Sequence, residues 1–308
     1  MSLSIDPARR VHVRAPGKLN LFFDVGAVGD DGYHEVASVY QAVSLFEDLW
    51  ASHDEGFHLT VTGDVDVSGV PLDERNLALR AARAVTESVG WEGGIRLQIH
   101  KGVPVAGGMG GGSADAAAAL VAVNELIDAG LSTAELHALG ARLGADVPFA
   151  LLGGTAVGTG RGDELAPALG RGRFAWVLVT DGDGLSTPEV YGTLDRLRET
   201  ADIRPGRLMP EVDPAVLRAL RSGDAAALAA AIRNDLQLAA VHLRPALADV
   251  LDAGLAAGAL GGLVSGSGPT VAFLAADDAH ADGIAAHLAE QGHTSHAVTG
   301  PVAGTRIL

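Results

Sequence analysis

The residues from Val103 to Leu120 (VPVAGGMGGGSADAAAAL) have a composition that suits polyphosphate binding. Five of the six residues from Gly107 to Gly112 are glycine, and a run rich in alanine follows. Glycine costs about 0.5–1 kcal/mol relative to alanine inside a regular element, so this cluster predicts a loop. Without Cβ atoms, backbone N–H groups can approach phosphate oxygens closely. The chemistry indicated is anion binding by the main chain.

The segments on either side of the loop predict elements that could position it. Ile95 to His100 alternates apolar and polar residues, as a strand does. Ala114 to Ala129 predicts a helix that ends at Gly130. The order strand, loop, helix directs N–H groups and the positive end of a helix dipole to one point. The alternative is a ligand-free flexible loop, or close packing of a helix on a strand.

Two common glycine signatures do not fit this loop. A Walker loop ends in Gly-Lys-Ser/Thr, whereas Gly112 is followed by Ser113 and Ala114. The dinucleotide fingerprint Gly-x-Gly-x-x-Gly, started at Gly108, ends on Ser113 instead of glycine. The loop therefore belongs to another class of phosphate site.

The composition limits the class of protein. A chain of 308 residues usually forms two domains, and 48% hydrophobic residues can build a substantial core. The absence of cysteine excludes disulfides, thiol nucleophiles and Cys–metal sites and suits a reducing cytoplasm. A net charge of −16 argues against nucleic-acid binding. The apolar runs are too short to span a membrane, and the N-terminus has no signal-peptide pattern.

Lysine is rare in this chain. Of the 22 basic residues, only Lys18 and Lys101 are lysines. Lysine is a compact point charge on a thin stem, whereas arginine is a planar fork. A lysine kept where arginine dominates indicates a place where a guanidinium would not fit. The alternative is a chance surface lysine.

The remaining pattern predicts an α+β protein with a domain boundary in the Gly- and Arg-rich segment 169–173, giving domains 1–170 and 171–308. A break is expected at Ala15-Pro16-Gly17 between two strands. The first domain is expected to hold strands at 11–14, 19–25, within 34–48 and at 57–61, helices at 76–89 and from the capping box at 132–135, and a hairpin near 155–162. The second is expected to hold a strand at 174–180, helices opening at 187 and 213, Ala-rich helices to 258, a strand–turn–strand at 263–275, a helix and a last strand.

Three glycine-containing segments lie at the ends of predicted strands: Ala15–Asn20, Pro104–Ala114 and Ser265–Thr270. Together they resemble the three motifs of the GHMP small-molecule kinases, the superfamily of galactokinase, homoserine kinase and mevalonate kinase. The middle motif has Met109 where the family usually has leucine. The resemblance covers essentially the whole chain and keeps the order of the motifs.

Two further segments resemble one branch of that superfamily: Asp31–Glu35 (DGYHE) and Gly144–Phe149 (GADVPF). This branch uses ATP to phosphorylate a hydroxyl of a cytidine-diphosphate-linked methylerythritol in the non-mevalonate isoprenoid pathway. Ala106, Ala114 and Asp115 replace a Gly, a Ser and an Asn that are frequent in the family, which affects the details of phosphate contact.

The resemblance implies a two-domain GHMP kinase fold, with a ribosomal-protein-S5-like N-terminal domain, a ferredoxin-like C-terminal domain and the active site between them. It also implies ATP as phosphoryl donor with Mg²⁺, and Ser113 as a residue that could reach the metal. The implied ATP-binding residues are Asn76, Pro104, Val105, Ala106, Gly107, Gly108, Met109, Gly110, Gly111, Gly112, Ser113 and Ala114.

The resemblance assigns the catalytic roles to Lys18 and Asp146. Phosphoryl transfer needs positioning and charge neutralisation. Asp146 would accept the proton of the acceptor hydroxyl as a general base, and Lys18 would neutralise charge beside it. Without the resemblance, the sequence would favour a capping or helix C-terminal turn carboxylate at Asp146.

Substrate contacts are implied next to these residues. Tyr33 could cover a base or ribose and His34 could read a cytosine edge, with a half-buried Tyr–His pair as the alternative. Arg161 and Asp163 lie in a predicted turn and are interpreted as solvated charges. The implied substrate-binding residues are Asn20, Tyr33, His34, Tyr191, Gly266, Ser267 and Gly268.

Two rival functions stay open on the sequence. One is a GHMP kinase for another small alcohol, of the homoserine or mevalonate type, although such an enzyme would lack the Gly-Tyr-His segment. The other is a non-catalytic nucleotide-binding regulator, which would be expected to lose Lys18 or Asp146. The expected partner is a cytidine-diphosphate-linked sugar alcohol, with no nucleic acid and no membrane, in the cytoplasm; the oligomeric state is open.

Overall fold

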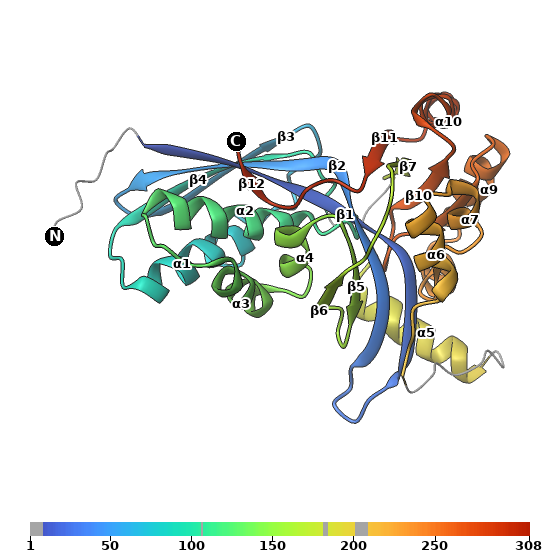
Figure 1. The fold of residues 1–308 in the computed structure, drawn as a ribbon, viewed down its shortest axis with the longest axis horizontal. Coiled ribbons are helices and arrows are strands. Elements are labelled where there is room, and N and C mark those ends of the chain that lie inside the picture. Colours follow the sequence, from blue (N-terminus) through green and yellow to red (C-terminus); the bar gives the residue numbers. More distant parts are fainter. Residues whose placement is uncertain (1–8, 106, 181–183, 201–208) are drawn as a thin grey trace.

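The computed structural model describes residues 9–105, 107–180, 184–200 and 209–308. These residues form two sheets, each covered by helices (Figure 1). The elements of the first half are β1 (Arg10–Val28), β2 (His34–Asp54), β3 (Phe57–Gly63), α1 (Leu77–Val89), β4 (Gly94–Lys101), α2 (Gly111–Leu126), α3 (Thr133–Leu143), α4 (Val147–Leu152), β5 (Thr155–Thr159) and β6 (Glu164–Pro167).

The second half continues with a smaller sheet, in the strand order β11-β7-β10-β9. The elements of the second half are β7 (Phe174–Val179), α5 (Thr187–Thr200), α6 (Pro214–Ser222), α7 (Ala225–Ala229), β8 (Arg233–Asn234), α8 (Gln237–Leu243), α9 (Ala246–Ala256), β9 (Gly261–Val264), β10 (Val271–Ala275), α10 (Asp278–Glu290), β11 (Ser295–Gly300) and β12 (Arg306–Ile307). The α+β class expected from the sequence is confirmed.

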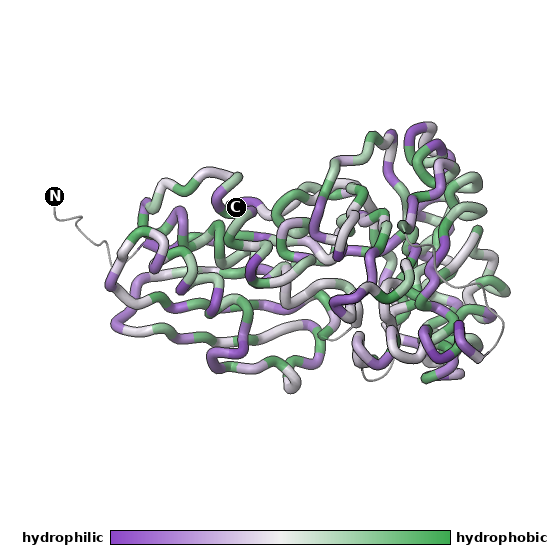
Figure 2. Tube along the Cα trace, turned by 90° about the horizontal axis from the view of Figure 1, so that it is seen from below, coloured by the Kyte–Doolittle hydropathy of each residue, from purple (hydrophilic) through white to green (hydrophobic). Residues whose placement is uncertain are grey.

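The large sheet has the strand order β12-β1-β2-β4-β3 and buries one face against α1 and α2. Alternating residues of its strands, among them Val13, Leu49 and Leu97, enter this core, because side chains alternate between the two faces of a strand. The alanines of α2 are fully buried, and their small size allows the helix to lie close to the sheet. In Figure 2, hydrophobic and hydrophilic stretches alternate along the chain in both halves.

The expected break at Ala15-Pro16-Gly17 is wrong. β1 runs through it as one strand paired with β2, and the pairing register shifts between Pro16 and Gly17. A local irregularity of this kind bends a strand without ending it. A Cβ at Gly17 would lie 3.1 Å from Val103 Cγ2, so the strand passes close to the start of the glycine loop.

The helices that follow the glycine loop and Asp146 begin differently from the prediction. The helix after the glycines was expected from Ala114, but α2 begins at Gly111. The short helix α4, which follows Asp146, was not predicted. By contrast, the helix expected over 76–89 is present as α1, with Asn76 as its N-cap, and the capping box of Ser132 and Glu135 at the start of α3 is confirmed.

Two short strands of the second half join the large sheet. β8 pairs in parallel with β1 at Phe22 and Phe23, and β12 pairs antiparallel with β1 at Val13 and Arg14. The division of the chain after residue 170 stays a prediction.

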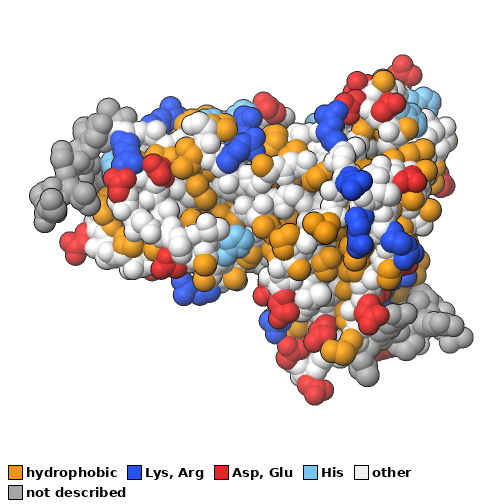
Figure 3. All heavy atoms as spheres, viewed as in Figure 1, with side chains coloured by type: hydrophobic (Ala, Val, Ile, Leu, Met, Phe, Trp, Pro, Cys, Tyr) orange, Lys and Arg blue, Asp and Glu red, His pale blue; other side chains and the backbone are white. Residues whose placement is uncertain are grey.

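Surface charge and helix length are the structural features that relate to nucleic-acid and membrane partners. Acidic and basic side chains are interspersed on the face shown in Figure 3. Within the described residues, each helix is too short or too polar to cross a membrane.

Candidate active site

The glycine loop ends at the N-terminus of α2. Gly110 occupies the N-cap position with left-handed backbone angles (φ 71°, ψ 23°), which favour glycine. It has no side chain to accept the first amides of the helix, so these donors can serve an anionic ligand. A Cβ at Gly110 would lie 3.3 Å from Lys18 Cγ and 3.7 Å from Asp146 Oδ2. Glycine therefore keeps the helix end open and leaves room for these two side chains.

The same loop packs directly on the third glycine segment, residues 265–270. A Cβ at Gly108 would lie 3.0 Å from the carbonyl oxygens of Ser265 and Gly268, and one at Gly107 would lie 2.9 Å from Thr270 Oγ1. Larger residues would push the two loops apart. Glycine at these positions thus brings a loop of the first half against a loop of the second half.

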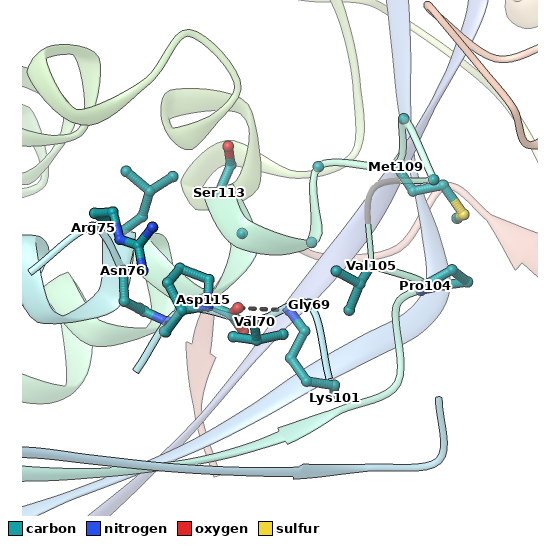
Figure 4. A pocket seen from close by; sticks show the side chains of 17 residues that line it. Gly69, Val70, Arg75, Asn76, Lys101, Pro104, Val105, Met109, Ser113 and Asp115 are labelled. Carbon is teal, nitrogen blue, oxygen red and sulfur yellow. Dashed lines mark hydrogen bonds and ion pairs between the residues drawn. The ribbon is translucent and has the colours of Figure 1, made fainter. Parts of the chain in front are cut away.

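A cavity of about 370 Å³ opens on one side of the glycine loop (Figure 4). Asn76 lies in its wall, but its side chain is engaged: Oδ1 accepts from Ala78 N at 2.9 Å and Nδ2 donates to Pro71 O at 2.8 Å. Ala114 packs in the core instead, and Ala106 lies outside the described residues. The cavity is lined by Gly69, Val70, Pro71, Arg75, Asn76, Leu77, Lys101, Pro104, Val105, Gly107, Gly108, Met109, Gly110, Gly111, Gly112, Ser113 and Asp115.

A second cavity, of about 200 Å³, lies on the other side of the loop and is called the acceptor cavity below. Gly108 and Gly110 line both cavities. A phosphoryl group held by the loop would therefore border on both. The acceptor cavity is lined by Lys18, Asn20, Phe23, Tyr40, Gly108, Gly110, Asp146, Arg161, Thr187, Tyr191, Leu236, Gly266 and Ser267.

Lys18 and Asp146 meet in the acceptor cavity. Lys18 Nζ lies 3.8 Å from Asp146 Oδ2, and the Lys18 side chain is almost fully buried. Asp146 stands at the N-cap position of α4, but its side chain makes no capping hydrogen bond. The capping role that the sequence left open therefore does not occupy this carboxylate, which is one-third exposed toward the cavity.

Asn20 fixes the position of Lys18. Its Oδ1 accepts from Lys18 Nζ at 2.7 Å, while its Nδ2 donates to Ser38 Oγ at 2.8 Å. The backbone N–H of Asn20 donates to Ser265 Oγ at 3.2 Å, which joins β1 to the third glycine segment. A Cβ at Gly266 would lie 3.1 Å from Asn20 Oδ1. The 265–270 segment therefore packs directly on the Lys18–Asn20 pair.

A third cavity, of about 470 Å³ and called the hairpin cavity below, is lined by Tyr33 and His34, whereas Tyr191 lines the acceptor cavity. The His34 ring is engaged, with Nδ1 3.0 Å from Gly26 O and Nε2 3.2 Å from Asp195 Oδ2. Its centroid lies 5.2 Å from that of Tyr191. Burial raises the pKa of the Tyr191 phenol, which is therefore neutral. The hairpin cavity is lined by Ala27, Val28, Gly29, Asp31, Tyr33, His34, Glu35, Gly160, Arg161, Asp163 and Glu164.

Sequence reasoning missed a buried charged cluster beneath the glycine loop. Lys101 Nζ lies 2.6 Å from Glu47 Oε1 and 2.6 Å from Asp115 Oδ2, and all three side chains are at most 4% exposed. Burial and the neighbouring Asp115 raise the pKa of Glu47 to about 8, and burial also raises that of Asp115. A Cβ at Gly111 would lie 2.9 Å from Glu47 Oε1, so the cluster supports the start of α2. The rarity of lysine and the unusual Asp115 were the signals that could have revealed it.

Tyr40 is a second residue that the sequence did not single out. It lines the acceptor cavity, and its ring lies 5.8 Å from Lys18 Nζ. Burial, together with the charge of Asp146, raises the pKa of the Tyr40 phenol well above its usual value. The side chain is therefore a neutral wall beside the charged pair.

Comparison with known proteins identifies the family. The GHMP kinases N terminal domain matches residues 76–154, and the GHMP kinases C terminal domain matches residues 216–294. The chain belongs to the GHMP kinase family. The first match contains the glycine loop and Asp146, and the second contains the 265–270 segment of this GHMP kinase.

The curated relatives are similar over almost their whole length. A 4-diphosphocytidyl-2-C-methyl-D-erythritol kinase of Clavibacter michiganensis subsp. michiganensis is 54% identical over 300 residues, covering 97% of this chain and 96% of the relative. One of the same name from Leifsonia xyli subsp. xyli is 55% identical over 301 residues, covering 97% and 98%.

Solved structures of GHMP kinases also resemble this chain. A crystal structure of 4-(cytidine 5′-diphospho)-2C-methyl-D-erythritol kinase has a TM-score of 0.77 at 33% identity, covering 94% of this chain and 98% of that one. A mevalonate kinase of L. major in complex with R-mevalonate has a TM-score of 0.75 at 18% identity, a likeness that shows the fold alone.

Proposed function

We propose that this GHMP kinase transfers a phosphoryl group from ATP to the 2-hydroxyl of 4-diphosphocytidyl-2-C-methyl-D-erythritol, giving the 2-phosphate and ADP in the non-mevalonate isoprenoid pathway. The observation that carries phosphoryl transfer is the junction of two cavities at Gly108 and Gly110, with Lys18 and Asp146 beside it. The choice of acceptor rests on the relatives of 54–55% identity that carry this substrate in their names.

In this proposal ATP occupies the cavity that Asn76 lines, with its terminal phosphates on the glycine loop. The amides of Gly111 and Gly112 and the dipole of α2 stabilise negative charge there. Asp146 accepts the proton of the acceptor hydroxyl, and Lys18 offsets the charge that develops on the transferred group. Asn20 holds Lys18 in place through its 2.7 Å hydrogen bond.

The protein oxygens near the glycine loop could hold Mg²⁺ only together with the phosphate oxygens of the nucleotide. The described residues contain no cluster of three or more His, Cys, Asp or Glu side chains that could hold a metal ion. Mg²⁺ commonly keeps several waters and binds through substrate phosphates plus few protein oxygens. Here the phosphates and the Ser113 hydroxyl would hold it, and the ion would neutralise phosphate charge. We also propose a cytoplasmic location, which suits a chain without cysteine.

The acceptor assignment is tested by measuring ADP formation with three alcohols: 4-diphosphocytidyl-2-C-methyl-D-erythritol, homoserine and mevalonate. We expect turnover with the cytidine compound at a kcat/KM at least 100-fold above the other two. Preference for homoserine or mevalonate would replace the proposed acceptor. ADP formation with none of them, together with tight ATP binding, would favour a nucleotide-binding regulator.

A further inference from the structure

Arg161 connects the acceptor cavity with the hairpin cavity. Among the described lining residues, it is the single residue common to both. It lies in the turn between β5 and β6, where Gly160 (φ 66°) and Gly162 (φ 93°) flank it. The turn is anchored to β2, because Val36 N donates to Gly160 O at 2.8 Å. The guanidinium therefore projects from a fixed turn at the boundary of the two cavities.

The guanidinium is held in place but keeps unused donors. Nη2 of Arg161 donates to Asp31 Oδ2 at 2.8 Å, and the group lies 3.9 Å from the centroid of the Tyr33 ring. A guanidinium has five N–H donors in a planar fork, which matches the oxygens of phosphates. The Arg161 side chain is 55% exposed, which fits the interpretation of a solvated turn charge. Solvation alone does not explain why this residue lines both cavities.

The charges around the hairpin cavity make this cation distinctive. Asp31, Glu35, Asp163 and Glu164 line the cavity, and Arg161 is the cation among its described lining residues. In the acceptor cavity, Lys18 is engaged by Asn20 and faces Asp146. An anionic group that passes from one cavity to the other would meet its opposite charge at Arg161.

The proposed acceptor has such a group. It is a cytidine joined to a sugar alcohol through a diphosphate. Its hydroxyl is placed at Asp146 in the acceptor cavity, and Tyr33, the implied contact of the base or ribose, lines the hairpin cavity. We propose that Arg161 binds the diphosphate of the acceptor and selects acceptors that carry it. This inference rests on the proposed function and adds a specificity-determining residue to it.

The test compares cytidine 5′-diphosphate with cytidine as competitive inhibitors against the diphosphate-linked acceptor at saturating ATP. In the parent enzyme we expect the diphosphate to bind at least tenfold more tightly than the nucleoside, through charge-assisted hydrogen bonds to Arg161. In Arg161→Met, which keeps an unbranched apolar stem and removes the guanidinium, this ratio should fall about tenfold. The KM for the acceptor should rise by a similar factor, while the KM for ATP stays near the parent value.

Arg173→Met is the matched control. Arg173 is 58% exposed and pairs with Asp278, so it resembles Arg161 in exposure and partner but lies on neither cavity. Its substitution should leave both inhibition constants unchanged. Arg161→Lys, which keeps the charge but not the fork, should retain part of the discrimination, and an intact thermal transition confirms that each variant is folded.

Each outcome bears on a different claim. An unchanged diphosphate-to-nucleoside ratio in Arg161→Met overturns the assignment of Arg161 even if the parent enzyme phosphorylates the acceptor well. A parent enzyme that binds the two inhibitors equally also overturns it. A parent enzyme that neither phosphorylates the acceptor nor binds either inhibitor overturns the proposed function as well.

Discussion

Lys18 and Lys101 are both buried beside the glycine loop, yet their surroundings differ. Lys101 Nζ has two carboxylate partners at 2.6 Å, from Glu47 and Asp115. Lys18 Nζ has an amide oxygen at 2.7 Å and a carboxylate at 3.8 Å, and it borders a cavity. An ammonium has three donors, so Lys101 has committed most of its capacity, whereas Lys18 can still receive an anion. The contrast separates a lysine that supports the loop from one that serves the reaction.

The largest expected effect concerns the pair at the cavity. Asp146→Asn keeps the size and removes the base, so kcat should fall about 10²–10⁴-fold with both substrates still bound. Lys18→Arg should also be slow, because a planar fork does not replace a compact charge. Since the two residues act as one unit, the double variant should be little worse than the worse single variant.

Steady-state kinetics of the three variants, with substrate affinities measured separately, check this prediction. Asp213→Asn is a suitable control, because Asp213 is the N-cap of α6 and asparagine caps a helix equally well. Near-parent kcat in Asp146→Asn would remove the general-base role. Fully multiplicative losses would show that Lys18 and Asp146 act independently.

The next effect is on stability. Lys101→Met leaves the buried acidic side chains of Glu47 and Asp115 without their cation, and breaking a buried ion pair in this way costs about 3–5 kcal/mol. Lys18→Met should cost clearly less, since Asp146 is one-third exposed and can be solvated. Urea unfolding of both variants measures the difference. Equal losses would mean that the two lysines do not differ as supports of the fold.

The third expected effect is a pH dependence of the free energy of unfolding. The pKa of Glu47 is raised from 4.5 to about 8, so the folded chain holds a proton that the unfolded chain releases. The resulting stabilisation is complete below about pH 4.5 and is lost as the pH rises to about 8, at up to about 1.4 kcal/mol per pH unit. Glu47→Gln should lack this contribution.

The measurement compares the free energy of unfolding of the parent and of Glu47→Gln between pH 5 and pH 8. The parent should lose stability relative to the variant as the pH rises. Parallel curves would show that the Lys101 cluster does not retain a proton.

Local signals allowed much of the fold to be predicted. The capping box of Ser132 and Glu135 and the N-cap at Asn76 involve neighbours in sequence, and both are present. The continuity of β1 through Pro16 could not be seen, because it depends on pairing with β2. α4 is only six residues long and is stabilised by packing, with Val147 and Phe149 buried.

The residues of the candidate site likewise fall into those that a local sequence pattern reveals and those that only the fold brings together. The glycine loop is local in sequence and could be recognised from its composition. The contacts between Glu47, Lys101 and Asp115 join β2, β4 and α2, so no spacing rule reveals them. The placement of Arg161 between two cavities likewise depends on the hairpin β5–β6 meeting the hairpin β1–β2 at Asp31.

The attachment of β8 and β12 to β1 has a consequence for the handling of the two halves. Expressed alone, residues 1–170 would expose the backbone donors and acceptors of β1 that these two strands now cover near Phe22 and Val13. Unpaired strand edges attract other chains and promote aggregation or strand exchange between copies. The first half is thus completed by strands of the second half, which favours retaining both halves on one polypeptide.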